Sequence, residues 1–271
     1  MAVTTSQQIT HYYDQFRDID VTFTKEVIRA TLLYPKQVFL KCLGYQWPCI
    51  IYSSSMAGAK VIVSMTSSLR DTVKKANNLV SLRFSFLQKD KADPLSFFVS
   101  AKVSGSTPYG SQKPELHFLT LTYTQRPPDD LIEVLGKLLD AHTTSKRRKE
   151  QRIPVTAETA RKIGINAKDV LLYIEGVPRR CIIRDISFGG AKLIILGVAK
   201  FLVDKAATLR LQVTEDDSYV DIQGTVVRFE AVEGRNDIAA IAVQFDDETV
   251  PVGYKMLLST FLRSTKTSAP E

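Results

Sequence analysis

The sequence predicts a mainly β protein built from two tandem small antiparallel β-barrels, each closed by a C-terminal α-helix. One observation behind this prediction is a segment that occurs twice. Residues 49–63, CIIYSSSMAGAKVIV, and residues 181–195, CIIRDISFGGAKLII, are identical at eight of fifteen positions. Chance would give about one identity, so the chain contains an internal duplication. The other observation is that each half has strand-like runs first and one amphipathic run last.

The duplication continues beyond this segment. SLRFSF at 81–86 resembles TLRLQV at 208–213, and VSAKV at 99–103 lies opposite IQGTV at 222–226. The order of the matching runs is kept while their offset drifts, which is what different loop lengths in two copies of one fold would produce.

The first copy contains six runs of strand length that are rich in β-branched and aromatic residues and broken by polar or turn residues. These runs are QVFLKCL at 37–43, CIIYSS at 49–54, AKVIVSM at 59–65, SLRFSF at 81–86, LSFFVSAKV at 95–103 and HFLTLTY at 117–123. The copy ends with PPDDLIEVLGKLLDAH at 127–142. Its prolines and acids at the start, followed by leucines at helical spacing, predict an amphipathic helix.

The second copy repeats this plan. Its strand-like runs are VLLYIEG at 170–176, CIIRDIS at 181–187, AKLIIL at 191–196, TLRLQV at 208–213, DIQGTVVRFE at 221–230 and IAAIAVQF at 238–245. A closing helix is expected at 251–263, PVGYKMLLSTFLR. Between the copies lies a polar segment without periodicity, HTTSKRRKEQR at 142–152, which is expected to be a hinge. The predicted division is a segment 1–20, a barrel domain 21–142, a basic hinge 143–152, a second barrel domain 153–263 and a disordered tail 264–271.

Composition limits the class of protein. The chain has 271 residues, a formal charge of +7, and no apolar run of the roughly 18 residues that a membrane helix needs. Its first residues lack the basic and apolar regions of a secretory signal. Three widely spaced cysteines, Cys42, Cys49 and Cys181, indicate neither a disulfide framework nor a zinc site. A cytoplasmic protein without a membrane span is expected.

Catalytic and metal chemistry find little support. His11, His117 and His142 are scattered, without acids or cysteines at ligand or triad spacing. The acids of FDDE at 245–248 lead towards the closing helix, and solvated acids near a helix N-terminus are the expected interpretation. The sequence therefore predicts no catalytic residues, no metal site and no cofactor, and a protein that is not an enzyme.

Two segments have the chemistry of a nucleotide site. In RDISFGGAKL, Asp185 and Ser187 are two residues apart on a predicted strand and so are expected to share a face, beside Gly189 and Gly190. A carboxylate can accept hydrogen bonds from N1 and N2 of guanine. The run SKRRKEQR at 145–152 supplies arginines, which bind phosphate or the O6 and N7 edge of guanine. Together these groups would suit a guanine nucleotide.

The pair of motifs resembles the PilZ domain, the bacterial receptor module for cyclic di-GMP. An Arg-x-x-x-Arg, Arg148 and Arg152, precedes a barrel, and about thirty residues later comes Asp-x-Ser-x-x-Gly, Asp185, Ser187 and Gly190. The resemblance covers residues 145–263, and the layout is similar to tandem receptors of the YcgR and PlzA types. It implies a cyclic di-GMP effector in second-messenger signalling, with motility or flagellar braking as an output and a flagellar motor component as a possible protein partner.

The resemblance also implies roles for individual residues. Arg148 and Arg152 would bind phosphate and the Hoogsteen edge of guanine, Asp185 and Ser187 would bind the other guanine edge, and Gly190 would permit the turn. Arg147 would stack on a second ligand molecule. Arg184 and Arg228 are further candidates, for which a surface salt bridge is the simpler interpretation.

The first copy lacks this chemistry. Ser53 stands where Asp185 stands, Ser55 and Gly58 match Ser187 and Gly190, and upstream the sequence is DQFRDIDVTF, with Arg17 alone among acids. The first domain is therefore expected to keep the fold without the ligand site and to bind the partner. Because the arginines lie in the hinge, ligand binding is expected to order that segment and fix the angle between the domains.

Two other interpretations remain at the level of the sequence. A sequence pI near 9.2 and the basic hinge could serve nucleic-acid binding, with or without control by cyclic di-GMP, although no stacking platform or nucleic-acid motif is visible. The chain could also be a structural adaptor with an inactive second domain, against which the intact pair of motifs argues.

Overall fold

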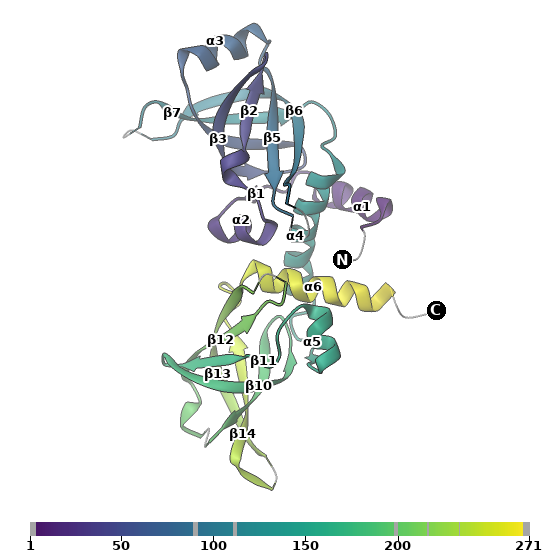
Figure 1. Ribbon diagram of the computed structural model, residues 1–271, viewed down its shortest axis with the longest axis vertical. Coiled ribbons are helices and arrows are strands. Elements are labelled where there is room, and N and C mark those ends of the chain that lie inside the picture. Colours follow the sequence, from purple (N-terminus) through teal and green to yellow (C-terminus); the bar gives the residue numbers. More distant parts are fainter. Residues whose placement is uncertain are drawn as a thin grey trace. The chain divides into compact units, whose positions relative to one another are not determined.

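A computed structural model describes residues 4–88, 92–110, 113–197, 200–215, 217–232 and 234–267. The chain divides into two compact units, residues 1–139 and 140–271, which we call unit 1 and unit 2. Helix α4 (Asp129–Arg147) runs across the division between them. Each unit holds one β-barrel (Figure 1).

Six strands of unit 1 form a closed antiparallel barrel in the order β3-β2-β5-β6-β7-β4, and β4 pairs back with β3. A short strand, β1 (Val21–Thr22), adds to the outside edge of β3. The barrel strands are β2 (Phe39–Cys42), β3 (Tyr45–Ser54), β4 (Gly58–Ser64), β5 (Leu79–Phe86), β6 (Leu95–Pro108) and β7 (Leu116–Tyr123). Unit 1 also contains α1 (Ser6–Phe16), α2 (Lys25–Thr31), the 3₁₀ turn η1 (Pro35–Gln37) and α3 (Ser67–Lys75).

Unit 2 repeats this topology. Its closed order is β10-β9-β12-β13-β14-β11, with β11 pairing back to β10 and the short strand β8 (Ile153–Pro154) on β10. The barrel strands are β9 (Leu171–Ile174), β10 (Val177–Ile186), β11 (Gly190–Leu196), β12 (Ala206–Gln212), β13 (Tyr219–Val232) and β14 (Arg235–Phe245). The remaining elements are α5 (Ala157–Ile163), η2 (Lys200–Leu202) and α6 (Val252–Thr267), and α5 packs against α6.

The strands form because apolar and polar residues alternate along them. In β12, Ala207, Leu209 and Leu211 are buried in the barrel core, while the residues between them face outward. The same alternation in the other strands fills both barrels with aliphatic and aromatic side chains, and the three cysteines are buried there as free thiols. The predicted strand runs and the predicted fold class are confirmed.

The two barrels share their register as well as their topology. Val21 pairs with Ser54 and Thr22 with Ser53, while at the corresponding places Ile153 pairs with Ile186 and Pro154 with Asp185. A β-bulge between Ile51 and Ser53 recurs between Ile183 and Asp185. The duplication predicted from the sequence is therefore present in the backbone pairing itself.

The helices differ from the prediction in extent. Helix α4 continues to Arg147, so residues 143–147 of the predicted hinge are helical, and Lys146 and Arg147 lie where cations favour a helix C-terminus. Helix α6 continues to Thr267, so the predicted disorder of residues 264–267 is wrong, and residues 268–271 lie outside the described residues. Helices α1, α2, α3 and α5 were not predicted, because helices of seven to eleven residues show little periodicity.

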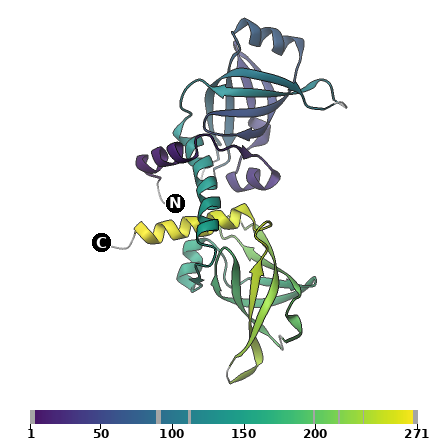
Figure 2. The same cartoon turned by 180° about the vertical axis from the view of Figure 1, so that it is seen from behind.

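Helix α1 lies against α4 (Figure 2). Thr5 caps α1 in a reciprocal pair with Gln8, and the helix buries Ile9, Tyr12 and Phe16. The contact depends on Gly136 of α4, since a Cβ atom there would lie 2.4 Å from the ring of Tyr12. Residues 6–16 thus belong to the first barrel unit. None of the described helices is long and apolar enough to cross a membrane.

Replacing Gly136 with alanine should destabilise unit 1, because the added methyl group overlaps the Tyr12 ring. We expect the free energy of unfolding to fall by about 1–3 kcal/mol, measured by calorimetry or denaturant titration. Gly253→Ala is the matched control, because a Cβ atom at Gly253 would meet nothing within 4 Å. An unchanged stability for Gly136→Ala would show that α1 does not pack as described.

Candidate functional site

The bulge in β10 places two polar residues on the outside of the second barrel. Ile183 pairs with Leu193 and Asp185 with Lys192, which leaves Arg184 as the extra residue. Ile183 and Ile186 are buried, Arg184 is exposed and Asp185 is half-buried. A carboxylate therefore stands on the outer barrel face next to an exposed arginine.

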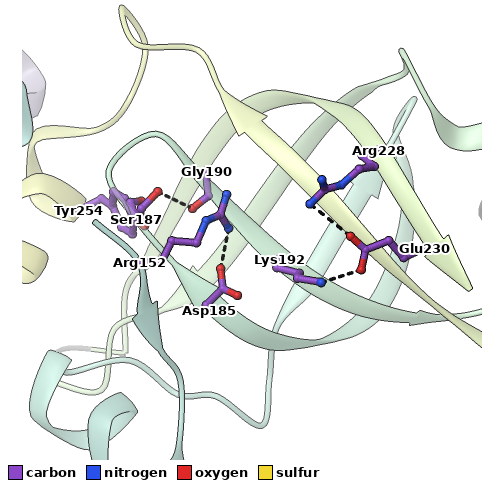
Figure 3. Close-up of polar contacts among 8 residues, drawn as sticks. All are labelled: Arg152, Asp185, Ser187, Gly190, Lys192, Arg228, Glu230 and Tyr254. Carbon is purple, nitrogen blue, oxygen red and sulfur yellow. Dashed lines mark hydrogen bonds and ion pairs between the residues drawn. The ribbon is translucent and has the colours of Figure 1, made fainter. Parts of the chain in front are cut away.

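Strand β8 brings Arg152 to this carboxylate. Ile153 is buried, and its pairing with Ile186 fixes the position of the residue before it. Nη1 of Arg152 donates to Oδ1 of Asp185 at 2.5 Å, with the two side chains 45% and 22% exposed (Figure 3). Two predicted site residues from separate motifs are thus in direct contact.

Ser187 does not share the outer face with Asp185, and this expectation is wrong. Strand β10 ends at Ile186, so the two-residue alternation does not reach Ser187, which is 1% exposed. Its hydroxyl donates to the carbonyl oxygen of Gly190, while its own carbonyl accepts from the hydroxyl of Tyr254 at 2.7 Å (Figure 3). Ser187 holds the turn after β10 against helix α6.

The two glycines of this turn exclude a side chain for different reasons. A Cβ atom at Gly190 would lie 2.5 Å from the carbonyl oxygen of Val243, and Gly58 of unit 1 has the same conflict with Leu121. Gly190 is therefore required by the barrel. A Cβ atom at Gly189 would instead lie 2.9 Å from Cγ of Lys149, whose carbonyl accepts from the Gly189 amide at 3.1 Å. Gly189 makes room for the basic segment.

The basic segment is also held by an ion pair. Lys149 contacts Asp247, which raises the pKa of the lysine, so the FDDE acids are not all merely solvated as expected. Arg147 is exposed at the end of α4, and Arg148 is half-buried in the turn that follows. Within the described residues, neither of these guanidinium groups has a hydrogen-bond or ion-pair partner.

A row of charged side chains continues across the barrel from Asp185. Asp185 pairs with Lys192, Lys192 with Ala242, and Ala242 with Arg228, so all four lie on one face. Glu230 binds both cations of this row, Lys192 at 2.7 Å and Arg228 at 3.2 Å (Figure 3). The salt bridge anticipated for Arg228 is present, and Lys192 lowers the pKa of Glu230.

The outer face therefore presents two half-buried carboxylates, Asp185 and Glu230, among guanidinium and ammonium groups, and Glu230 already pairs with Lys192 and Arg228. Such a surface can accept hydrogen bonds at one point and bind anionic or electron-rich oxygen and nitrogen atoms around it. No group of three or more metal-ligating side chains is present in the described parts of the chain.

The corresponding place in unit 1 has an acid in place of the arginine and a neutral serine in place of the aspartate. Asp20 precedes β1 as Arg152 precedes β8, and Ser53 occupies the register position of Asp185. Oγ of Ser53 donates to Oδ2 of Asp20 at 2.8 Å. The prediction that Ser53 stands where Asp185 stands is confirmed, and the arginine is replaced by an acid.

Several residues of this site were not found from the sequence: Lys149, Lys192, Glu230, Asp247 and Tyr254. Lys149 lies inside the Arg-x-x-x-Arg motif, which was a usable signal. The others come from β11, β13, the segment after β14 and α6, and only the three-dimensional pairing brings them together.

Comparisons with known proteins agree with two related domains. A model of the PilZN3 domain matches residues 7–142, and a model of the PilZ domain matches residues 146–263. The chain is 44% identical over 271 residues to a protein of Treponema denticola named cyclic di-GMP binding protein, covering 100% of this chain and 86% of that protein.

Solved structures of similar fold include the Borreliella burgdorferi PlzA protein in complex with c-di-GMP. It is 24% identical, covering 94% of this chain and 98% of that one, with a TM-score of 0.43. YcgR of Escherichia coli in complex with c-di-GMP is 11% identical, covering 90% and 88%, with a TM-score of 0.29.

Proposed function

The chain belongs to the PilZ family, and on that premise we propose that it is a cyclic di-GMP receptor that binds its ligand on unit 2. The observation that carries the proposal is the contact between Arg152 and Asp185, which joins the two motifs on the outer barrel face. The name of the Treponema denticola relative supports the same ligand.

The chemistry of this pair suits a guanine nucleotide. Asp185 would accept hydrogen bonds from N1 and N2 of guanine, while Arg152 and Arg148 would bind phosphate and the O6 and N7 edge. In the structure described here Arg152 and Asp185 bind each other. A ligand that offers donors to the acid and acceptors to the arginine would satisfy both groups when it separates them.

The remaining candidates take supporting roles in this proposal. Ser187, Gly189 and Gly190 shape the turn beside the ligand, with Gly189 admitting the basic segment. Arg147 is exposed and would stack on a second ligand molecule. Arg184 adjoins Asp185 in β10, and Arg228 lies further along the same face on β13, where it would exchange its partner Glu230 for the ligand.

We infer further that the ligand controls the relation between the units. The arginines that would bind the ligand lie at the end of α4 and in residues 148–152. Binding would replace the present pair of Arg152 with Asp185 by contacts to the ligand, fix this segment through the ligand and reorient the units. Unit 1 would then act on a protein partner, and the PilZ family resemblance suggests a flagellar motor component or another effector.

Nucleic-acid binding by the basic segment is less well supported. Lys149 pairs with Asp247 and Arg152 with Asp185, so two of its cations are already neutralised. The three others, Lys146, Arg147 and Arg148, offer little to a polyanion, whose affinity depends on many phosphate contacts.

Calorimetric titration of cyclic di-GMP tests the receptor proposal directly. Wild type should bind, and the Arg148→Ala/Arg152→Ala variant should lose detectable binding, since each charge-assisted contact contributes about 1.5–3 kcal/mol. Lys205→Ala/Arg235→Ala, which removes two paired cations elsewhere on unit 2, should bind as wild type does. Absence of binding by wild type, or steeply salt-dependent binding of single-stranded DNA that cyclic di-GMP does not affect, would contradict the proposal.

The reorientation has its own test. ¹⁵N relaxation should give different rotational correlation times for the two units without ligand, and these should converge when cyclic di-GMP is added. The Arg148→Ala/Arg152→Ala variant should show no change at the same ligand concentration. Identical relaxation with and without bound ligand would mean that binding does not couple the units.

A further inference from the structure

A concave surface with both apolar and polar side chains lies on the outside of the barrel of unit 1, away from the residues that correspond to the site of unit 2. It forms an open groove of about 500 Å³ beside β2, β5 and β6, whose apolar walls are Leu43, Leu79 and Phe98 and whose polar lining includes Ser81, Ser100 and Thr124. These three side chains are 60%, 51% and 48% exposed. We call this surface, together with Lys41 and Arg83, the Phe98 face.

Leu43 stands at an unusual backbone position. Leu43 and Gly44, between β2 and β3, have φ values of 46° and 86°, the left-handed pair of a tight hairpin turn. Such turns favour asparagine or aspartate before glycine. Unit 2 has Glu175 and Gly176 at the same place, with φ values of 49° and 82°, and Glu175 pairs with Lys205 at 2.8 Å. The stability of the barrel gives no reason for an exposed leucine here.

Because the two units are copies of one fold, the Phe98 face can be compared with the corresponding face of unit 2, which carries Glu175 and Asp221. Arg83 pairs with Phe98 across β5 and β6, and Arg210 pairs with Asp221 across β12 and β13. Asp221 binds Arg210 through two hydrogen bonds of 2.7 Å. Phe98 thus replaces a carboxylate, which removes the partner of the arginine and adds an exposed ring.

Among the described residues, the two cations of the Phe98 face contact aromatic rings and not carboxylates. Nζ of Lys41 lies 5.3 Å from the centre of the Phe98 ring, and Cζ of Arg83 lies 5.9 Å from that of Phe39. In the described part of the chain, neither Lys41 nor Arg83 has a carboxylate partner. Arg83 donates to the hydroxyl of Ser96 at 3.2 Å. The face therefore combines exposed apolar area with two positive charges free to bind acids.

We propose that the Phe98 face is the partner-docking surface of unit 1, and that it binds a protein segment in which a large apolar side chain lies next to a carboxylate. The apolar side chain would enter between Leu43, Leu79 and Phe98, and the carboxylate would bind Lys41 or Arg83. This inference rests on the proposed partner role of unit 1, but it does not depend on ligand binding by unit 2.

The composition of the face favours a protein over a nucleic acid. Two of its three apolar walls are leucines, which give bases no stacking surface, and its cations are two in number. Single-stranded nucleic acid is usually bound by several aromatic platforms along a groove with many cations. A groove in which exposed apolar side chains lie beside polar groups and cations can anchor a protein partner.

The experiment selects random twelve-residue peptides displayed on phage against the full chain, with counter-selection on the Phe98→Asp variant. This variant places a carboxylate beside Arg83, as Asp221 lies beside Arg210, so the barrel should tolerate it. Enriched peptides should contain an aromatic or aliphatic residue next to aspartate or glutamate. Their affinity should fall at least tenfold with Phe98→Asp and with Lys41→Ala.

Cyclic di-GMP titration and the melting temperature of the same variants separate this inference from the proposed function, because both should match wild type. Three results would overturn the docking proposal: no enriched peptide, peptides that bind Phe98→Asp as tightly as wild type, or a dT15 oligonucleotide that binds wild type and not Phe98→Asp. The last result would assign the face to nucleic acid instead.

Discussion

Two residue pairings between β8 and β10 determine what the second unit can do. Ile153 and Ile186 are buried against the core, and their pairing fixes the register of β8. A slip of one residue would turn Ile153 outward and Arg152 towards the core, which the barrel cannot accommodate. The hydrophobic core thereby holds Arg152 beside Asp185, although neither of these two residues belongs to the core.

The same strand pairing in unit 1 has different polar residues beside it. Val21 and Ser54 repeat the pairing of Ile153 and Ile186, yet the polar residues beside them are Asp20 and Ser53. On the face formed by β5 and β6, Phe98 likewise replaces the acid that Asp221 supplies in unit 2. The barrel requires its buried positions and its glycine at the turn, while the outer side chains are free to change. One fold can therefore support the proposed nucleotide site in one unit and the proposed docking surface in the other.

Much of this could be predicted from the sequence, because strand alternation and the repeated segment are local signals. The assignment of Arg152 and Asp185 to one site followed from pairing the two motifs, whereas their direct ion pair was not predicted. The burial of Ser187 could not be predicted, since it depends on β10 ending one residue earlier. The pairs of Glu230 with Lys192 and of Asp247 with Lys149 join distant parts of the chain, and only the strand register brings them together. The extension of helix α4 to Arg147 was not predicted, because residues 143–147 are polar and show no apolar periodicity.

The most direct test replaces the polar pair of unit 2 by that of unit 1 and leaves the buried residues of the barrel unchanged. The double substitution Arg152→Asp and Asp185→Ser gives unit 2 the polar pair that unit 1 already holds between Asp20 and Ser53. The account predicts an unchanged melting temperature together with a loss of cyclic di-GMP affinity of more than about a hundredfold, since two charge-assisted contacts are removed. Binding within tenfold of wild type would contradict the assignment of the site. An unfolded unit 2 would contradict the claim that the stability of the barrel does not depend on the polar pair on its outer face.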